Sequence, residues 1–238
     1  NKLNLNSNSL VIEIASNDGY LLQFFKEKNI SCLGVEPTKS TAAASRKKGI
    51  KTITEFFGSN LAIKLKKSNK IADLMIANNV LAHVPDINDF LIGFSILLKN
   101  TGVATFEFPH LINLIQKNQF DTIYHEHFSY LSLTSIDSIM KKNNLEIFDV
   151  KKLATHGGSL RVYVQKKYGG NKIITKRVFD LLESEDSLGI KSVKFYNGFF
   201  KKSTLIKNEF ISFLNIKKKQ GKKVAAYGAA AKGNTLLN

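Results

Sequence analysis

The chain has 238 residues, which is long enough for one sizeable α/β domain and a fragment of another. The net charge is +16, but 32 of the 35 basic residues are Lys (35 − 3 Arg). Arg is the preferred residue for bidentate phosphate contacts, so a nucleic-acid-binding domain is disfavoured. The sequence has no apolar run of membrane-spanning length, and its single cysteine, Cys32, excludes an internal disulfide and favours a reducing, cytoplasmic environment.

The first half of the chain alternates between short apolar runs and amphipathic segments. Such alternation is typical of a mostly parallel sheet with right-handed helical crossovers. Strands are predicted at residues 10–15, 32–36, 51–53, 71–77 and 102–107. Helices are predicted around residues 21–25, at 38–49, at 58–67 and, after an Asp86 cap, at 87–98.

The second half predicts an antiparallel end to this sheet, followed by helices. Residues 134–137 resemble a capping box that opens a helix to Lys142. Further strands are predicted at residues 145–150, 159–165 and 223–228, and helices at 171–186 and 191–220. The chain is therefore divided into a first domain at 1–170, a helical connector at 171–222 and the truncated start of a C-terminal α/β domain at 223–238.

A turn at residues 16–19 joins the first strand to a helix and leaves backbone N–H groups at the carboxyl edge of the sheet, where open α/β sheets bind ligands. Glu36 ends the second strand, 17 residues beyond Gly19, where a carboxylate can accept both hydroxyl groups of a ribose. The turn lacks the Gly-x-Gly-x-x-Gly triplet of a nicotinamide site. The carboxylates of Glu13 and Asp18 suit the ammonium and sulfonium groups of S-adenosylmethionine (SAM), which is the predicted cofactor.

All five histidines lie between residues 83 and 156, and two belong to the run Tyr124-His125-Glu126-His127. The run supplies two imidazoles, a carboxylate and a phenol, which transfer or orient protons near neutral pH. In an extended segment, the two imidazoles face opposite to Glu126. A His-x-His pair can also bind a metal, but no third ligand has recognisable spacing, and no metal site is predicted.

Several segments occur together in a particular order. They are Glu-Ile-Ala-Ser-Asn-Asp-Gly-Tyr-Leu-Leu (13–22), Gly-Val-Glu-Pro (34–37), Asn-Asn-Val-Leu-Ala-His-Val (78–84), Tyr-His-Glu-His-Phe-Ser-Tyr (124–130), His-Gly-Gly-Ser-Leu-Arg-Val (156–162) and Tyr-Gly-Ala-Ala-Ala-Lys-Gly-Asn-Thr (227–235). Together they resemble the SAM-dependent sugar C-methyltransferases that act on nucleotide-linked 4-keto-deoxysugars.

This resemblance implies a class I SAM-methyltransferase, with a Rossmann-like sheet that is mostly parallel, has an antiparallel end and carries helices on both faces. Residues 1–170 would then form the SAM-binding domain. Members of the family also have an N-terminal zinc-binding domain, which is missing here, and a C-terminal domain that helps to hold the nucleotide-sugar. Ala15 departs from the family pattern, in which Gly is common, but we expect SAM binding to survive.

The resemblance also implies roles for individual residues. It assigns the catalytic base to His127 and makes Tyr124, Glu126 and His83 neighbours that orient the base, bind the sugar or stabilise an enolate oxygen. Asn78 and Asn79 are expected near the methionine part of SAM, and Phe56 and Phe57 either flank the adenine or pack in the core. The full set of predicted cofactor-binding residues is Glu13, Ala15, Asn17, Gly19, Glu36, Pro37, Phe56, Asn78 and Asn79.

The predicted function is methyl transfer from SAM to a carbon beside the ketone of a nucleotide-linked keto-deoxysugar, through an enolate formed by a base. A methyltransferase of the same fold that acts on oxygen or nitrogen is the first alternative, since it needs no base beside an acidic C–H. A nicotinamide oxidoreductase and a basic nucleic-acid-binding domain are weaker alternatives. The predicted partner is a nucleotide-sugar substrate, without nucleic acid or membrane, and the predicted location is the cytoplasm.

Overall fold

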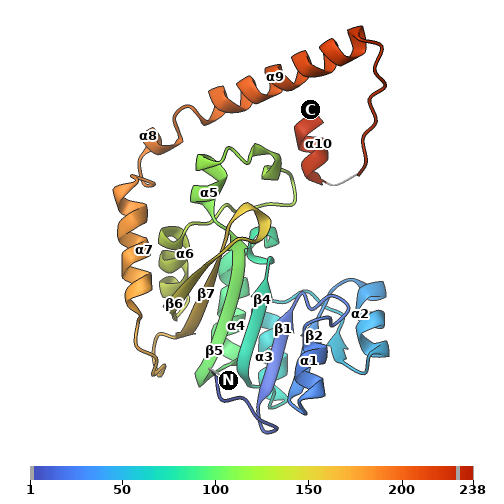
Figure 1. The fold of residues 1–238 in the computed structure, drawn as a ribbon. Helices are drawn as coiled ribbons and strands as arrows, with labels where there is room; N and C mark the ends of the chain where they lie inside the picture. The colour runs from blue at the N-terminus through green and yellow to red at the C-terminus, as the bar shows by residue number, and fades with distance from the viewer. Residues whose placement is uncertain (1–2, 229–230, 238) are drawn as a thin grey trace.

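A seven-stranded sheet forms the centre of the protein (Figure 1). The computed structural model describes residues 3–228 and 231–237. The strand order is β3-β2-β1-β4-β5-β7-β6, with β1 to β5 parallel and β7 antiparallel to both β5 and β6. This arrangement confirms the predicted mostly parallel sheet with an antiparallel end. The strands are β1 (Leu10–Ile14), β2 (Ser31–Val35), β3 (Lys51–Ile53), β4 (Ala72–Asn78), β5 (Leu98–Pro109), β6 (Leu145–Leu153) and β7 (Ser159–Lys166).

Helices cover both faces of the sheet, as predicted. The larger core lies under α3 (Ser59–Lys67), α4 (Ile87–Leu97), α6 (Leu133–Lys142) and α7 (Lys176–Ser187). A smaller core lies under α1 (Leu22–Glu27) on the other face, near α2 (Lys39–Lys47) (Figure 1). Asp86 caps α4 by accepting the backbone N–H groups of Asn88 and Asp89 at 3.1 and 3.0 Å, which confirms the predicted cap.

Two predicted helix starts are wrong. Helix α6 is capped by Ser132, whose hydroxyl accepts the N–H of Ser135 at 3.1 Å, so the capping box lies two residues before the predicted one. Helix α7 begins at Lys176 rather than at residue 171. The preceding segment cannot coil because Gln165 holds the N–H and the carbonyl of Lys172 at 2.7 and 2.9 Å.

The C-terminal third departs most from prediction. The single helix predicted at 191–220 is divided into α8 (Val193–Tyr196) and α9 (Phe199–Lys219), because Gly198 between them has a φ of 83°. The strand predicted at 223–228 is wrong, since those residues have no regular structure. Residues 229–230 and 238 of the predicted C-terminal domain lie outside the described residues, and the domain boundaries stay predictions.

The chain then returns to the carboxyl edge of the sheet. Helix α10 (Ala231–Leu237) packs against the short helix η2 (Phe120–Thr122), and the Thr235 hydroxyl donates to the carbonyl of Ile123 at 3.3 Å (Figure 1). The remaining short elements are η1 (Leu81–His83), α5 (Leu111–Gln116) and η3 (Thr155–Gly157). Within the described ranges, no helix combines the length and apolar character needed to cross a membrane.

Candidate functional site

Three residues with left-handed backbone conformation shape the turn after β1. Ala15, Asn17 and Gly19 have φ values of 54°, 51° and 76°. Gly19 is required there, because a Cβ atom would lie 2.5 Å from Ile50 and 2.8 Å from Ser45. Asn tolerates this region, whereas Ala does not favour it. The turn predicted at residues 16–19 is therefore present, and it carries backbone strain at Ala15.

Replacing Ala15 with Gly is expected to raise the free energy of unfolding by about 1 kcal/mol, because it relieves the left-handed strain of a residue with a Cβ atom. Urea denaturation of the two proteins measures the difference. The same substitution at Ala44, inside α2, is the matched control and should lower the free energy of unfolding by about 0.5–1 kcal/mol. A loss of stability at both positions would contradict the assigned strain.

Glu36 connects the turn to the end of β2. Its carboxylate is 5% exposed and accepts the N–H of Asn17 at 3.1 Å and the N–H of Thr38 at 2.9 Å. Each carboxylate oxygen can accept a second hydrogen bond, so this arrangement leaves acceptor capacity for a ribose. The predicted contact of Glu36 with a ribose stays a prediction, as does that of the half-buried Pro37 beside it.

Unpartnered buried oxygen atoms gather where β1 and β4 end. Among the described residues, Glu13 Oε2, Ser16 Oγ, Asn78 Oδ1 and Asn79 Oδ1 are buried without a hydrogen-bond partner in the protein. Buried polar atoms are rarely left in this state, because each such loss costs about 1–3 kcal/mol. Burial also raises the pKa of Glu13 to about 8. These atoms indicate a polar ligand at this edge of the sheet.

The two phenylalanines proposed to flank an adenine behave differently. The Phe57 ring packs edge-on against Phe90 and Phe94, with centroid distances of 5.5 and 5.3 Å, and so belongs to the core. The Phe56 side chain is 85% exposed. Its predicted contact with the cofactor stays a prediction.

The histidine-rich segment forms a turn rather than an extended strand, so the side-chain alternation of an extended segment does not apply to it. The N–H of His127 donates to the carbonyl of Tyr124 at 3.0 Å. The N–H of Phe128 donates to the carbonyl of Ala82 at 2.7 Å and attaches the segment to η1. The turn brings side chains three residues apart onto one side, where Tyr124 and His127 meet.

His127 and Tyr124 form a hydrogen-bonded pair. His127 Nδ1 lies 2.8 Å from the carbonyl oxygen of Thr122, and because that oxygen only accepts, Nδ1 carries the proton. Nε2 is therefore the acceptor in the neutral ring, and the Tyr124 hydroxyl donates to it at 3.0 Å. Burial lowers the pKa of His127, and the nearby His83 lowers it further, although the Thr122 hydrogen bond opposes them. At neutral pH, His127 is thus an unprotonated imidazole suited to accepting a proton.

His83 lies beside this pair and is itself exposed, as are His125 and Glu126, which precede His127 in the sequence. The rings of His83 and His127 are 4.7 Å apart between centroids, and His83 Nδ1 donates to the carbonyl of Glu126 at 2.9 Å. In this structure, Glu126 contributes to the cluster through its backbone, and a catalytic role for its carboxylate stays a prediction.

A cavity of about 100 Å³ links the two predicted sites. Its lining includes Asn79 from the β4 edge, Tyr124 and His127 from the turn, and Lys232 from α10. The sequence interpretation quoted the segment around Lys232 but assigned that lysine no role. A run of small residues before a Lys does not predict which part of the protein that Lys contacts. Only the fold shows that α10 returns to this cavity.

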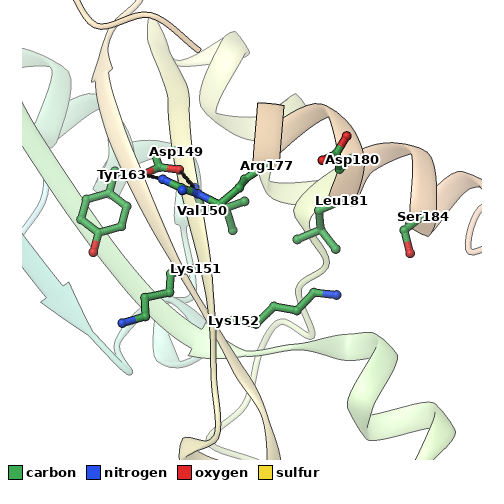
Figure 2. A pocket seen from close by; sticks show the side chains of 9 residues that line it. All are labelled: Asp149, Val150, Lys151, Lys152, Tyr163, Arg177, Asp180, Leu181 and Ser184. Carbon is green, nitrogen blue, oxygen red and sulfur yellow. Dashed lines mark hydrogen bonds and ion pairs between the residues drawn. The ribbon is translucent and has the colours of Figure 1, made fainter. Parts of the chain in front are cut away.

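A larger cavity of about 530 Å³ shares no lining residue with this site (Figure 2). It lies between the edge strand β6 and α7, and Arg177 pairs with Asp149 at 2.6 Å in it. Lys151 and Lys152, which also line it, are exposed lysines of an edge strand, where such residues discourage pairing with other chains.

Two buried carboxylates that the sequence interpretation missed hold the surrounding elements. Glu185 on α7 accepts His110 Nε2 at 2.8 Å and the N–H groups of Leu133 and Thr134 at 2.8 and 2.7 Å. Glu107 at the end of β5 pairs with Arg161 Nη2 on β7 at 2.6 Å. His110 is thus part of a structural network. No sequence spacing predicts it, because its partner lies 75 residues away.

The fold described above is that of class I SAM-dependent methyltransferases. A SAM-dependent methyltransferase from Clostridium acetobutylicum superposes with a TM-score of 0.55 and 16% identity, covering 69% of this chain and 86% of that one. The magnesium protoporphyrin IX methyltransferase from Synechocystis with bound S-adenosylhomocysteine superposes with a TM-score of 0.54 and 14% identity, covering 68% and 76%.

The chain belongs to the methyltransferase family whose domain model matches more than half of it. The family described as "Methyltransferase domain" matches residues 2–150, and the family described as "C-methyltransferase C-terminal domain" matches residues 154–238. The C-methyltransferase NovU from Streptomyces niveus is 32% identical over 99% of this chain. The chain spans 56% of the length of that protein, so only part of NovU is matched.

The residues at the β1 and β4 edge fit SAM. Glu13 supplies a carboxyl group, and the unpartnered oxygens of Asn78 and Asn79 are acceptors for the ammonium group of an amino acid. The carboxylate of Asp18, in contrast, pairs with Lys48 Nζ at 2.6 Å. No phosphate-binding glycine triplet is present. Within the described ranges, no group of three His, Cys, Asp or Glu residues could hold a metal ion.

The affinity for S-adenosylhomocysteine is expected to rise about tenfold per pH unit below pH 8, because the ammonium group favours ionised Glu13 while burial keeps the free protein's carboxyl protonated up to about 8. Binding then releases a proton, so higher pH favours it. Calorimetric titration measures this slope. Glu13→Gln should remove it, whereas the exposed control Glu27→Gln should not. A pH-independent affinity of the unmodified protein would contradict this role of Glu13.

Proposed function

We propose that this protein is a SAM-dependent C-methyltransferase that methylates a carbon beside the ketone of a nucleotide-linked keto-deoxysugar. One observation supports this most: the neutral His127, bonded to Tyr124, lines the same cavity as Asn79 of the cofactor edge. Attack on a cofactor-bound methyl group by carbon requires a base at that place, because a C–H bond beside a ketone must first lose its proton.

In the proposed reaction, the base removes a proton and the cofactor provides the methyl group. His127 Nε2 takes the proton from the carbon, and the electron pair of that C–H bond moves to the ketone oxygen to give an enolate. The Nδ1 hydrogen bond to Thr122 holds the ring orientation and stabilises the imidazolium that forms. Bound SAM supplies the methyl group to the enolate carbon and leaves as S-adenosylhomocysteine. Alignment of the two reactants contributes strongly, since effective molarities reach about 10⁵–10⁸ M.

Tyr124 gives the proton two routes to the same base. Its hydroxyl occupies the Nε2 lone pair at 3.0 Å. Either the phenol turns aside and Nε2 takes the proton directly, or the phenol oxygen takes it while the phenolic proton passes to Nε2. In both routes the proton ends on His127.

The substrate class rests on the family relationship. NovU is a C-methyltransferase, and the motifs quoted above resemble enzymes that use nucleotide-linked 4-keto-deoxysugars. We therefore propose a nucleotide-sugar partner, deoxysugar biosynthesis as the process and the cytoplasm as the location. Neither nucleic acid nor a membrane is part of this proposal.

Solvent exchange separates the proposed reaction from methyl transfer to oxygen or nitrogen. With S-adenosylhomocysteine bound, the protein should exchange deuterium from D₂O into the carbon beside the ketone of a nucleotide-linked 4-keto-deoxysugar. Mass spectrometry detects the added mass. An O- or N-methyltransferase has no need of this step, so methyl transfer without exchange would favour that alternative.

A further inference from the structure

Lys232 brings a positive charge to the cavity beside His127. It lies on α10, which packs against η2, and it is half-buried. The residues that line this cavity include no carboxylate. Within residues 3–228 and 231–237, no acidic side chain lies within ion-pair distance of Lys232. The ammonium group is therefore available to a negatively charged part of a ligand.

Three side chains that line the cavity already donate within the protein. His127 Nδ1 and His83 Nδ1 each donate to a backbone carbonyl, at 2.8 and 2.9 Å. The Tyr124 hydroxyl donates to His127 Nε2. An oxygen that gains negative charge in this cavity consequently lacks a donor from these three side chains. A further donor would favour such an oxygen, because a preorganised donor stabilises charge as it develops.

We propose that Lys232 is a catalytic residue that donates a hydrogen bond to the ketone oxygen of the substrate while His127 removes the neighbouring proton. The inference rests on the proposed function. As the C–H electron pair moves to the oxygen, the ammonium group stabilises the resulting enolate, and no proton leaves Lys232. When the enolate carbon takes the methyl group, the electron pair returns and the ketone forms again.

The position of Lys232 also affects the pKa of His127, the proposed base. The groups that face His127 are Tyr124, Glu126 and Tyr130 on its own segment, His83 on η1 and Lys232 on α10. Burial lowers the pKa of His127 most, and the positive charge of Lys232 lowers it further. Removing that charge should therefore raise the pKa of His127. A residue that only shaped α10 would not have this effect.

The test compares Lys232→Met with Lys232→Arg and with Lys223→Met, an exposed lysine outside the site. Deuterium exchange into a nucleotide-linked 4-keto-deoxysugar gives kcat and KM, and NMR titration of labelled His127 gives its pKa without substrate. For Lys232→Met we expect kcat for exchange to fall by about 10²–10³-fold with KM nearly unchanged. The pKa of His127 should rise. Lys232→Arg should retain the low pKa, and Lys223→Met should match the unmodified protein.

Three results would overturn the proposal. A higher KM with unchanged kcat would make Lys232 a binder of the substrate's phosphates. Unchanged kcat, KM and His127 pKa would place Lys232 outside the site. If Lys223→Met loses as much activity as Lys232→Met, the loss is not specific to Lys232. If the unmodified protein shows no exchange, the proposed function fails instead, and the substrate-free titration still reports whether Lys232 faces His127.

Discussion

Replacing His127 with Ala is expected to lower the rate of methyl transfer by about 10²–10⁴-fold, which is the usual contribution of a general base. The reason is the geometry of the turn: Nδ1 bonds to a carbonyl and Nε2 faces the Tyr124 hydroxyl, which makes this imidazole the proposed proton acceptor in the cavity. Affinity for S-adenosylhomocysteine should stay within about twofold, because the protein atoms proposed to bind the cofactor lie at the β1 and β4 edge. Calorimetry and a methyl-transfer assay on the same preparation measure both.

His125→Ala is the matched control. It removes an imidazole two residues away whose side chain is exposed, so activity should be retained. Equal losses in the two variants, or a parallel loss of cofactor binding in His127→Ala, would sink the assignment of the base. Tyr124→Phe then distinguishes the two proton routes, since a loss as large as that of His127→Ala indicates transfer through the phenol.

Replacing Glu185 with Gln is expected to lower the free energy of unfolding by about 1–3 kcal/mol for each buried donor that loses its partner. Glu185 is fully buried and accepts hydrogen bonds from His110 and from the first backbone N–H groups of α6. An amide can accept on one side only, so buried donors lose their partner. Guanidinium denaturation followed by circular dichroism measures the change. Glu183→Gln, exposed on the same helix, should change stability by less than about 0.5 kcal/mol.

The stabilisation that Glu185 contributes should decrease as the pH falls. Burial alone would raise the pKa of Glu185, but its hydrogen bonds, led by that of His110, outweigh burial and hold the pKa below the ordinary 4.5. Since the folded pKa is lowered, the stabilisation is complete above pH 4.5 and is lost as the pH falls through the folded value. A gap between the two proteins that widens on acidification would contradict this account.

The parallel half of the fold could be predicted because its signals are local. Short apolar runs between helical patterns located β1 to β5, and the Asp86 cap is a contact between near neighbours in the chain. The start of α6 could not be predicted in the same way. Both Ser132 and Thr134 are residue types that cap helices. Glu185, 51 residues beyond Thr134, accepts the N–H groups that follow Ser132. The break before α9 did have a signal, since Gly198 interrupts the helical pattern.

The candidate site also combines residues whose positions the sequence predicts with residues whose positions it does not predict. Glu13, Gly19, Glu36 and Asn78 lie together because strand ends in a parallel sheet meet at one edge, which topology alone predicts. The side-chain directions around His127 depend on contacts made after folding. The N–H of Phe128 bonds to the carbonyl of Ala82, 46 residues earlier, and a contact of this range has no signal in the local sequence. Lys232 reaches the cavity only because α10 folds back onto η2.

The most direct test of the proposed C-methylation uses SAM with a ¹³C-labelled methyl group and a nucleotide-linked 4-keto-deoxysugar. NMR of the product shows which atom carries the label. A labelled methyl group coupled to a ring carbon beside the former ketone, and absent with His127→Ala, is the result that the base and cofactor geometry predict. A labelled methyl group attached to oxygen or nitrogen would contradict the proposed C-methylation.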